Sequence, residues 1–293
     1  LHIEAHSFPT RRSSDLVFPC CKINLGLNVV ERRCDGYHNI ETVFYPIPLH
    51  DNLEVLSAKN ASQPYLFHQT GFELEGTPDN NLVIRVLNQL REDYKQIPPL
   101  EIWLHKRIPS GAGLGGGSSD AAFMMRLLNE QYDLQMDDED IEYRLSQLGA
   151  DCAFFYKAKP AYATGIGDQL MTLDFDLAGW NLVLVKPKIT VSTRDAYAMV
   201  KPKPSEESLL LSLSRDPETW KDTVKNDFEP SVFHRYPEIA AIKRTLYDMG
   251  ATYAAMSGSG SSVFGLFRNH QPEAAEIFHD CFVAEMRLRL PEP

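Results

Sequence analysis

The stretch that decides the fold reads Pro109-Ser110-Gly111-Ala112-Gly113-Leu114-Gly115-Gly116-Gly117-Ser118-Ser119-Asp120. The helix-forming residues 121–128 follow it, and an alternating strand pattern at residues 100–104 precedes it. Successive glycines let backbone N–H groups approach an anion, and a helix that starts there points the positive end of its dipole at the same place. The stretch therefore predicts a phosphate-binding loop. A flexible Gly/Ser connector is the alternative, which the position between a strand and a helix disfavours.

Two familiar nucleotide motifs do not fit this loop. Gly111, Gly113 and Gly116 satisfy the spacing G-x-G-x-x-G, but that fingerprint needs an acidic residue about twenty positions on, at the end of the next strand. Here that region is helical and acidic throughout, which disfavours a nicotinamide-dependent dehydrogenase. The Walker A pattern fails because no lysine precedes Ser118 and Ser119.

Outward from the loop, strand and helix patterns are mixed. Strands are expected at residues 23–30 and 42–45, the second ended by Pro46 and Pro48, and a helix with 3.6-residue periodicity is expected from residue 82 to 90. The acidic run 137–140 predicts the N-cap and first turn of a helix that reaches residue 148. Beyond about residue 160, strands at 181–185 and 263–267 and a helix at 237–249 suggest a second subdomain. The Gly/Ser run 257–262 could be only a hairpin connector.

Composition limits the class of protein. The 293 residues are 43% hydrophobic, enough for a sizeable core, and 29 basic against 40 acidic residues give a net charge of -11. That balance disfavours nucleic acid as a partner. Five cysteines without metal-site spacing predict reduced thiols in a cytoplasmic protein, and no apolar run approaches the roughly 20 residues of a membrane span. Residues 1–16 show no periodicity, so we expect a disordered or non-native leader there.

Four further segments carry a family resemblance together with the loop. They are Lys22-Ile23-Asn24-Leu25-Gly26-Leu27, Asp35-Gly36-Tyr37-His38, Gly149-Ala150-Asp151-Cys152 and Ala255-Met256-Ser257-Gly258-Ser259-Gly260-Ser261. With them, the chain resembles the GHMP kinase superfamily, whose phosphate loop has the form Pro-x-x-x-Gly-Leu-Gly-Ser/Gly-Ser-Ser. More narrowly, it is similar to the branch that phosphorylates a cytidylated methylerythritol. The resemblance covers essentially the whole chain from Val17.

The resemblance implies a two-domain α+β fold. Residues 17–162 would form an N-terminal, ATP-binding domain similar to ribosomal protein S5, and residues 163–293 a ferredoxin-like C-terminal domain. The implied reaction is phosphorylation of the 2-hydroxyl of the cytidylated methylerythritol by ATP, in the non-mevalonate route to isoprenoids. Alternatives are another GHMP kinase, acting on a mevalonate-type alcohol, homoserine or a sugar, and a catalytically silent nucleotide-binding paralogue.

The resemblance also assigns roles to residues. Lys22 and Asp151 would be catalytic: the carboxylate would orient or deprotonate the accepting hydroxyl, and Lys22 would keep it ionised near the γ-phosphate. Asn24, Tyr37 and His38 would contact the substrate, with Tyr37 stacked on the cytosine and His38 bonded to its edge. The ATP site would comprise Pro109, Ser110, Gly111, Ala112, Gly113, Leu114, Gly115, Gly116, Gly117, Ser118 and Ser119.

Other features of the site stay open at the level of sequence. Magnesium is implied by ATP, but no carboxylate cluster identifies its ligands; Ser119 and Asp151 are candidates. Two departures from the family pattern are Cys20-Cys21, where a small residue usually precedes the lysine, and Ala153, where a proline is common. The oligomeric state is not indicated.

Overall fold

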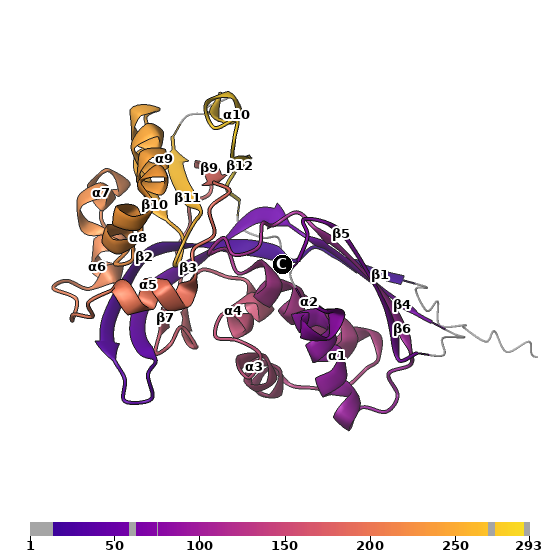
Figure 1. Ribbon diagram of the computed structural model, residues 1–293. Coiled ribbons are helices and arrows are strands. Elements are labelled where there is room, and N and C mark those ends of the chain that lie inside the picture. Colours follow the sequence, from indigo (N-terminus) through magenta and orange to yellow (C-terminus); the bar gives the residue numbers. More distant parts are fainter. Residues whose placement is uncertain (1–13, 59–62, 75, 269–272, 290–293) are drawn as a thin grey trace, which may run out of the picture.

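A computed structural model describes residues 14–58, 63–74, 76–268 and 273–289 (Figure 1). The strands are β1 Ser14–Val17, β2 Cys20–Arg32, β3 His38–His50, β4 Asn52–Ser57, β5 Tyr65–Gly71, β6 Leu100–Lys106, β7 Ala161–Thr164, β8 Gln169–Thr172, β9 Asn181–Lys186, β10 Tyr253–Met256, β11 Val263–Phe267 and β12 Phe282–Arg287. The α-helices are α1 Leu82–Asp93, α2 Gly116–Gln131, α3 Asp138–Ser146, α4 Cys152–Lys157, α5 Thr193–Met199, α6 Leu209–Leu213, α7 Trp220–Thr223, α8 Glu229–Arg235, α9 Pro237–Asp248 and α10 Ala274–Ile277. Short 3₁₀ turns lie at Pro78–Asn80 and Pro217–Thr219.

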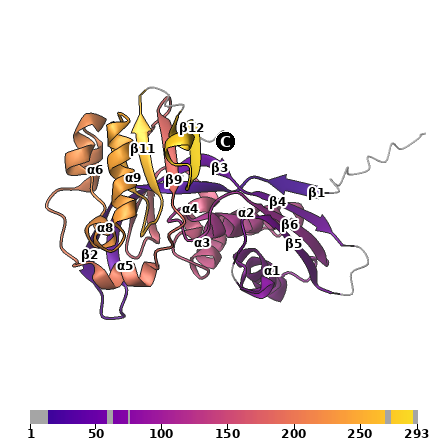
Figure 2. The same ribbon diagram turned by 45° about the horizontal axis from the view of Figure 1, so that its top comes forward.

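Three four-stranded sheets organise these elements. Their strand orders are β1-β4-β6-β5, β2-β3-β7-β8 and β10-β11-β9-β12. The third sheet is antiparallel throughout, and its order with the intervening helices is that of a ferredoxin-like unit. In both views the long β2–β3 hairpin runs beneath the C-terminal elements, while α1 to α4 lie on the other side of it (Figures 1 and 2).

Strand β2 separates the hydrophobic cores because its side chains alternate. Cys21, Ile23 and Leu25 enter a core shared with the third sheet, whereas Lys22 and Asn24 lie on the opposite face. At Gly26 the register with β3 shifts, and φ is +68°. An added Cβ there would lie 2.5 Å from Leu209 Cδ1, so this bulge requires glycine.

The expectation that Pro46 and Pro48 end a strand is wrong, because β3 continues to His50. Strand β3 lies between β2 and β7, and β7 pairs only with Thr42, Val43 and Phe44. Beyond Phe44 one edge of β3 therefore needs no N–H donors, and prolines are tolerated there. The helices follow the sequence more closely: Asp137 caps α3 through the N–H of Asp140, 2.9 Å away.

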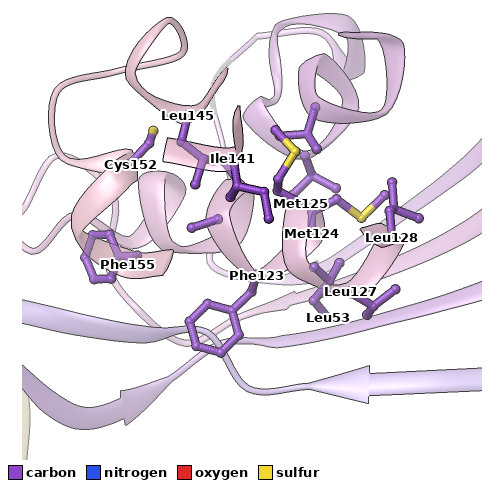
Figure 3. Packing of buried hydrophobic residues seen from close by; sticks show 14 of the residues in the cluster. Leu53, Phe123, Met124, Met125, Leu127, Leu128, Ile141, Leu145, Cys152 and Phe155 are labelled. Carbon is purple, nitrogen blue, oxygen red and sulfur yellow. The ribbon is translucent and has the colours of Figure 1, made fainter. Parts of the chain in front are cut away.

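Helix α2 is buried on most of its surface. Phe123, Met124, Met125, Leu127 and Leu128 all lie in one core with strands β4 and β6. Figure 3 shows Ile141 and Leu145 of α3 and Cys152 and Phe155 of α4 packed around the same helix. The start of α2, which follows the glycine loop, is thereby fixed by packing on several sides.

The structure describes the end of the expected leader and the region of the expected domain boundary. Of residues 1–16, the first thirteen lie outside the described residues, but Ser14–Val17 form β1, which pairs with the otherwise free edge of β4. Residues 14–16 are therefore not disordered, whereas a non-native origin of residues 1–16 stays a prediction. The boundary expected after residue 162 would lie inside β7, and β8 extends the same sheet. We propose to place the boundary between β8 and β9.

Candidate active site

The glycine loop joins β6 to α2 and is anchored by its apolar members. Ala112 and Leu114 are buried in the core shared with the third sheet, while Ser110, Gly111 and Gly117 are exposed. Gly115 is the N-cap of α2 with φ of +70°, and no side chain caps the helix. The first N–H groups of a helix lack partners within the helix, so an uncapped start next to an open loop can bind an anion.

Gly113 brings the loop against the second Gly/Ser run. A Cβ added to Gly113, whose φ is +73°, would lie 2.1 Å from the carbonyl oxygen of Ser257. The Ser257 hydroxyl donates to the carbonyl oxygen of Gly113 over 2.9 Å. Residues 257–262 therefore form one wall of the site. This run does more than connect β10 to β11.

Lys22 and Asp151 lie together beside the loop. The Nζ of Lys22 is 3.4 Å from Asp151 Oδ2 and donates to Asn24 Oδ1 over 2.7 Å, and its backbone N–H donates to Leu114. The Lys22 side chain is buried, whereas one third of the Asp151 side chain is exposed. Asp151 is the N-cap residue of α4, but its carboxylate makes no capping bond. It is thus free to accept a bond from a bound molecule.

Asn24 connects Lys22 to its surroundings. Its Nδ2 donates to Thr42 Oγ1 over 2.9 Å, and Thr42 in turn donates to the carbonyl of Gly26. Its backbone N–H donates to Ser257 Oγ over 3.3 Å. These bonds occupy Asn24 within the protein, so its geometry suits holding the Lys22 ammonium in place.

The predicted base-binding pair is only partly brought to this site. Tyr37 is 61% exposed near the tip of the β2–β3 hairpin, away from Lys22 and Asp151. The His38 ring stacks on that of Tyr197, with centroids 4.9 Å apart, and burial followed by the charge of Arg32 lowers the pKa of His38. Tyr197, in α5, lines a cavity of about 160 Å³ together with Lys22 and Asp151. His38 therefore contacts a residue that lines the cavity but does not line the cavity itself.

Several residues of this cavity were not found by sequence reasoning. Tyr197, Thr193 and Ser259 line it, and the Thr193 and Ser259 hydroxyls are 3.0 Å apart. Burial raises the pKa of Tyr197 to about 12, and the charge of Asp151 acts in the same direction, so its hydroxyl stays protonated at neutral pH. No local motif marks Tyr197 or Thr193, whereas Ser259 lies in the family segment 255–261 without a role assigned to it. A tyrosine at the helix spacing of α5 is indistinguishable from a core residue until the fold is known.

A second cavity of about 530 Å³ lies on the other side of the glycine loop. Ser110, Gly111 and Gly117 line it, together with residues that follow β5 and precede α1. Of the remaining loop residues, Pro109 and Ser119 are buried, and Gly116 and Ser118 are partly exposed. The Ser119 Oγ is buried and has no hydrogen-bond partner in the described part of the chain. A larger cleft of about 630 Å³, beside β12 and Phe72, contains none of the predicted site residues.

The cysteines next to Lys22 behave as packing residues. Cys20 lies in the core with α2 and Cys21 in the core shared with the third sheet. Burial raises the pKa of Cys20 to about 12 and also raises the pKa of Cys21 well above its usual value, so both thiols remain protonated. All five cysteines are free. The departure from the family pattern therefore leaves Lys22 in contact with Asp151.

Asn226 holds the wall formed by residues 257–262. Its Nδ2 donates to the carbonyl oxygens of Met256 and Gly258 over 2.8 and 2.9 Å, and its Oδ1 accepts from the N–H of Phe228. The side chain is buried. Phe228 also packs edge-on against Tyr197, with centroids 4.8 Å apart. The segment that begins at Asn226 thus supports two walls of the small cavity.

Comparison with known proteins agrees with this arrangement. The family described as GHMP kinases N terminal domain matches residues 81–159, and GHMP kinases C terminal matches residues 207–284. A protein of Bacteroides fragilis named 4-diphosphocytidyl-2-C-methyl-D-erythritol kinase is 51% identical over 274 residues, which are 94% of this chain and 100% of the relative.

Two solved structures are similar over nearly their whole length. A crystal structure of 4-(cytidine 5'-diphospho)-2C-methyl-D-erythritol kinase has a TM-score of 0.79 at 30% identity, covering 94% of this chain and 100% of that one. A homoserine kinase of Cytophaga hutchinsonii has a TM-score of 0.67 at 17% identity, with 97% and 96% covered. The second likeness is one of fold alone.

The chain therefore belongs to the GHMP kinases, and the expected α+β fold with its N- and C-terminal kinase domains is confirmed. Within that superfamily, identity of about one half over full length places it in the 4-diphosphocytidyl-2-C-methyl-D-erythritol kinase family.

We predict that Asn226→Ala destabilises the protein strongly. It would leave two carbonyl groups and one N–H unpaired in the interior, and each such group costs about 1–3 kcal/mol. Asn39→Ala is the matched control, because Asn39 bonds only to Glu31 at the surface and should cost less than about 0.5 kcal/mol. Urea unfolding of both variants tests this. Equal losses in the two variants would contradict it.

Proposed function

We propose that this chain transfers the γ-phosphoryl group of ATP to the 2-hydroxyl of 4-diphosphocytidyl-2-C-methyl-D-erythritol, a step of the non-mevalonate route to isoprenoid precursors. The observation that carries this conclusion is identity of 51% across the whole of a relative with that name. The contact between Lys22 and Asp151 beside the glycine loop supports it.

ATP would occupy the cavity of about 530 Å³, with its phosphates on the glycine loop. Ser110, Gly111 and Gly117 face this cavity, and the uncapped start of α2 offers N–H groups to an anion. Gly113 and Gly115 of the same loop line the smaller cavity that holds Asp151. A phosphate chain that follows the loop would therefore approach the carboxylate.

Lys22 and Asp151 would act on the accepting hydroxyl. A hydroxyl in the small cavity would donate to the free carboxylate of Asp151, which would orient it toward the phosphorus and accept its proton as the new bond forms. The Lys22 ammonium, fixed by Asn24, would balance the charge that builds up on the transferring group. In this mechanism Asn24 positions Lys22 and need not touch the substrate.

The cytidine end would lie along the β2–β3 hairpin. His38 and Tyr197 form a stacked pair at the rim of the small cavity, and Tyr37 lies farther along the same hairpin with most of its ring exposed. Exposed aromatic faces can take up a base by stacking. We assign base contacts to Tyr37 and His38, as the sequence suggests, and add Tyr197 as the residue whose ring supports that of His38.

Magnesium fits the start of α2. Mg²⁺ in kinases is held by one or two protein oxygens together with phosphate oxygens and water. The buried, unpartnered Oγ of Ser119 and the carboxylate of Asp151, which also pairs with Lys22, would supply these oxygens. No group of three His, Cys, Asp or Glu side chains in the described ranges is arranged for a metal. When bound, Mg²⁺ would neutralise charge on the phosphates.

Two alternative functions are disfavoured. A silent paralogue is disfavoured because Lys22 and Asp151 are both present and in contact. Another GHMP activity is not favoured by the names of the relatives.

None of the described helices is long and apolar enough to cross a bilayer. We further propose a cytoplasmic location, supported by five free thiols, and no nucleic-acid partner, supported by the net charge of -11.

The substrate can be tested directly. Purified protein with ATP and magnesium should release ADP with the cytidylated methylerythritol, and much more slowly with mevalonate, homoserine or galactose. The reason is that only the first substrate can contact both Asp151 and the aromatic residues of the hairpin. A preference for one of the other three alcohols would contradict the proposed function.

Asp151→Asn should lower kcat by about 10²–10⁴-fold with little change in the KM for ATP, because the amide keeps the shape but cannot accept the proton. If the transition state is largely dissociative, the loss should be near the lower end of that range. Asp137→Asn is a matched control: it removes the same charge at the N-cap of α3, where asparagine also caps. More than about a tenth of kcat remaining in a folded Asp151→Asn variant would exclude the base role.

Tyr197→Ala and Tyr37→Ala should each raise the KM for the cytidylated substrate and leave the KM for ATP unchanged. Stacking on a base contributes about 1–3 kcal/mol, which corresponds to roughly 5- to 150-fold in KM. Tyr143→Ala serves as the control, because Tyr143 is 66% exposed on α3 and lines neither cavity. Steady-state kinetics with both substrates distinguishes the variants. An unchanged KM would remove that tyrosine from the site.

A further inference from the structure

Three buried charged residues lie at the base of the glycine loop and have no role in the mechanism above. They are Asp51, between β3 and β4, Lys106, the last residue of β6, and Asp120, in the first turns of α2. Each is at most 2% exposed. Charges are rarely buried so completely without a specific arrangement around them, because their desolvation is costly.

The three side chains form one bonded cluster. Lys106 Nζ donates to Asp120 Oδ2 over 2.6 Å and also to Asp51 Oδ2. The second oxygen of Asp51 accepts the backbone N–H groups of Arg107 and Ile108, over 2.5 and 2.8 Å. Asp51 therefore fixes both the lysine and the backbone that leads into the loop.

The cluster lies where the glycine loop begins and ends. Lys106 and Asp120 flank the loop residues 109–119, so the ion pair between them closes the loop at its base. The backbone of Gly116 lies close above it: an added Cβ would be 3.5 Å from Lys106 Nζ and 2.9 Å from Ile108 Cγ2. The start of α2 is thus held directly against the end of β6.

Asp120 also faces the cavity of about 530 Å³ beside the glycine loop. It lines that cavity together with Ser110, Gly111 and Gly117, and its Oδ1 has no hydrogen-bond partner among the described residues. The same carboxylate therefore closes the loop and forms part of the surface over which the nucleotide would lie.

We propose that Lys106 and Asp120 are a positioning pair that holds the glycine loop open in the shape that receives the ATP phosphates, with Asp51 fixing the lysine. This inference rests on the proposed function only in assigning ATP to the loop. Gly111, Gly113 and Gly115 all have positive φ, and glycine adopts positive and negative φ about equally readily. These residues do not by themselves keep the loop in one conformation, so its shape depends on contacts that fix its two ends. Preorganisation of this kind increases affinity by lowering the entropy lost on binding.

The test compares Asp120→Ala, Asp120→Asn and a control, Leu246→Ala. Leu246 is fully buried in the core around α9, so its truncation destabilises the protein without touching the loop. ATP affinity is measured by calorimetry, kcat and KM for both substrates by steady-state kinetics, and stability by thermal unfolding.

We expect Asp120→Ala to weaken ATP binding about tenfold or more, comparable to the loss of one charge-assisted hydrogen bond, with the KM for the alcohol nearly unchanged. Asp120→Asn keeps an oxygen that accepts from Lys106 but loses the charge, so ATP binding should weaken by about threefold. Leu246→Ala should lower the melting temperature and leave ATP binding as in the parent protein.

Unchanged ATP affinity in the Asp120 variants would overturn the proposal, and so would an equal loss of affinity in Leu246→Ala, which would indicate general destabilisation. If Asp120→Ala does not fold, Asp120→Asn decides by the same criterion. Calorimetry with ATP alone does not involve the accepting alcohol. The proposed substrate can therefore fail while this inference stands, or the reverse.

Discussion

The site depends on one buried chain of hydrogen bonds that connects three parts of the molecule. Lys22 bonds to Asn24, Asn24 to Thr42 on the neighbouring strand and to Ser257 in the C-terminal part, and Ser257 to the glycine loop at Gly113. Each donor in this chain has an acceptor, which is the condition for burying polar groups at low cost. The Lys22 ammonium is consequently fixed relative to both the glycine loop and the opposite wall.

Local charge at the loop differs from that of the whole chain. The net charge is -11, yet two lysines, Lys22 and Lys106, are buried beside the loop. Two carboxylates outweigh burial and raise the pKa of Lys106, while burial, opposed by Lys106, raises the pKa of Asp120 to about 7. Lys106 therefore stays a cation at neutral pH because the carboxylates of Asp51 and Asp120 lie within bonding distance. Lys22 lies within bonding distance of Asp151 and Asn24. The positive charge that the proposed phosphate site requires is therefore supplied within that small region.

Sequence predicted what short-range physics determines. The loop, the Asp137 cap and helix α9, which ends before Gly250, follow from residues adjacent in the chain. The pairing of Lys22 with Asp151 came only from family resemblance, because no spacing brings those positions together. Tyr197 and Asn226 became visible only in three dimensions, and so did the bond from Ser257 to the glycine loop. The errors at Pro46 and at β1 have the same cause, since both depend on which strand edge has a partner.

The two cavities lead to a physical account of selectivity. The cavity at Asp151, about 160 Å³, has room for the reacting end of a substrate but not for a whole nucleotide-linked one. In the proposed mode of binding, the rest of such a substrate would extend past Tyr197 and His38 toward Tyr37, which is largely exposed in the free protein. A small alcohol such as homoserine would fill the cavity but leave the exposed ring of Tyr37 in water. Binding energy from the remote base, used to hold the hydroxyl against Asp151, would then distinguish the two substrates in kcat as well as in KM.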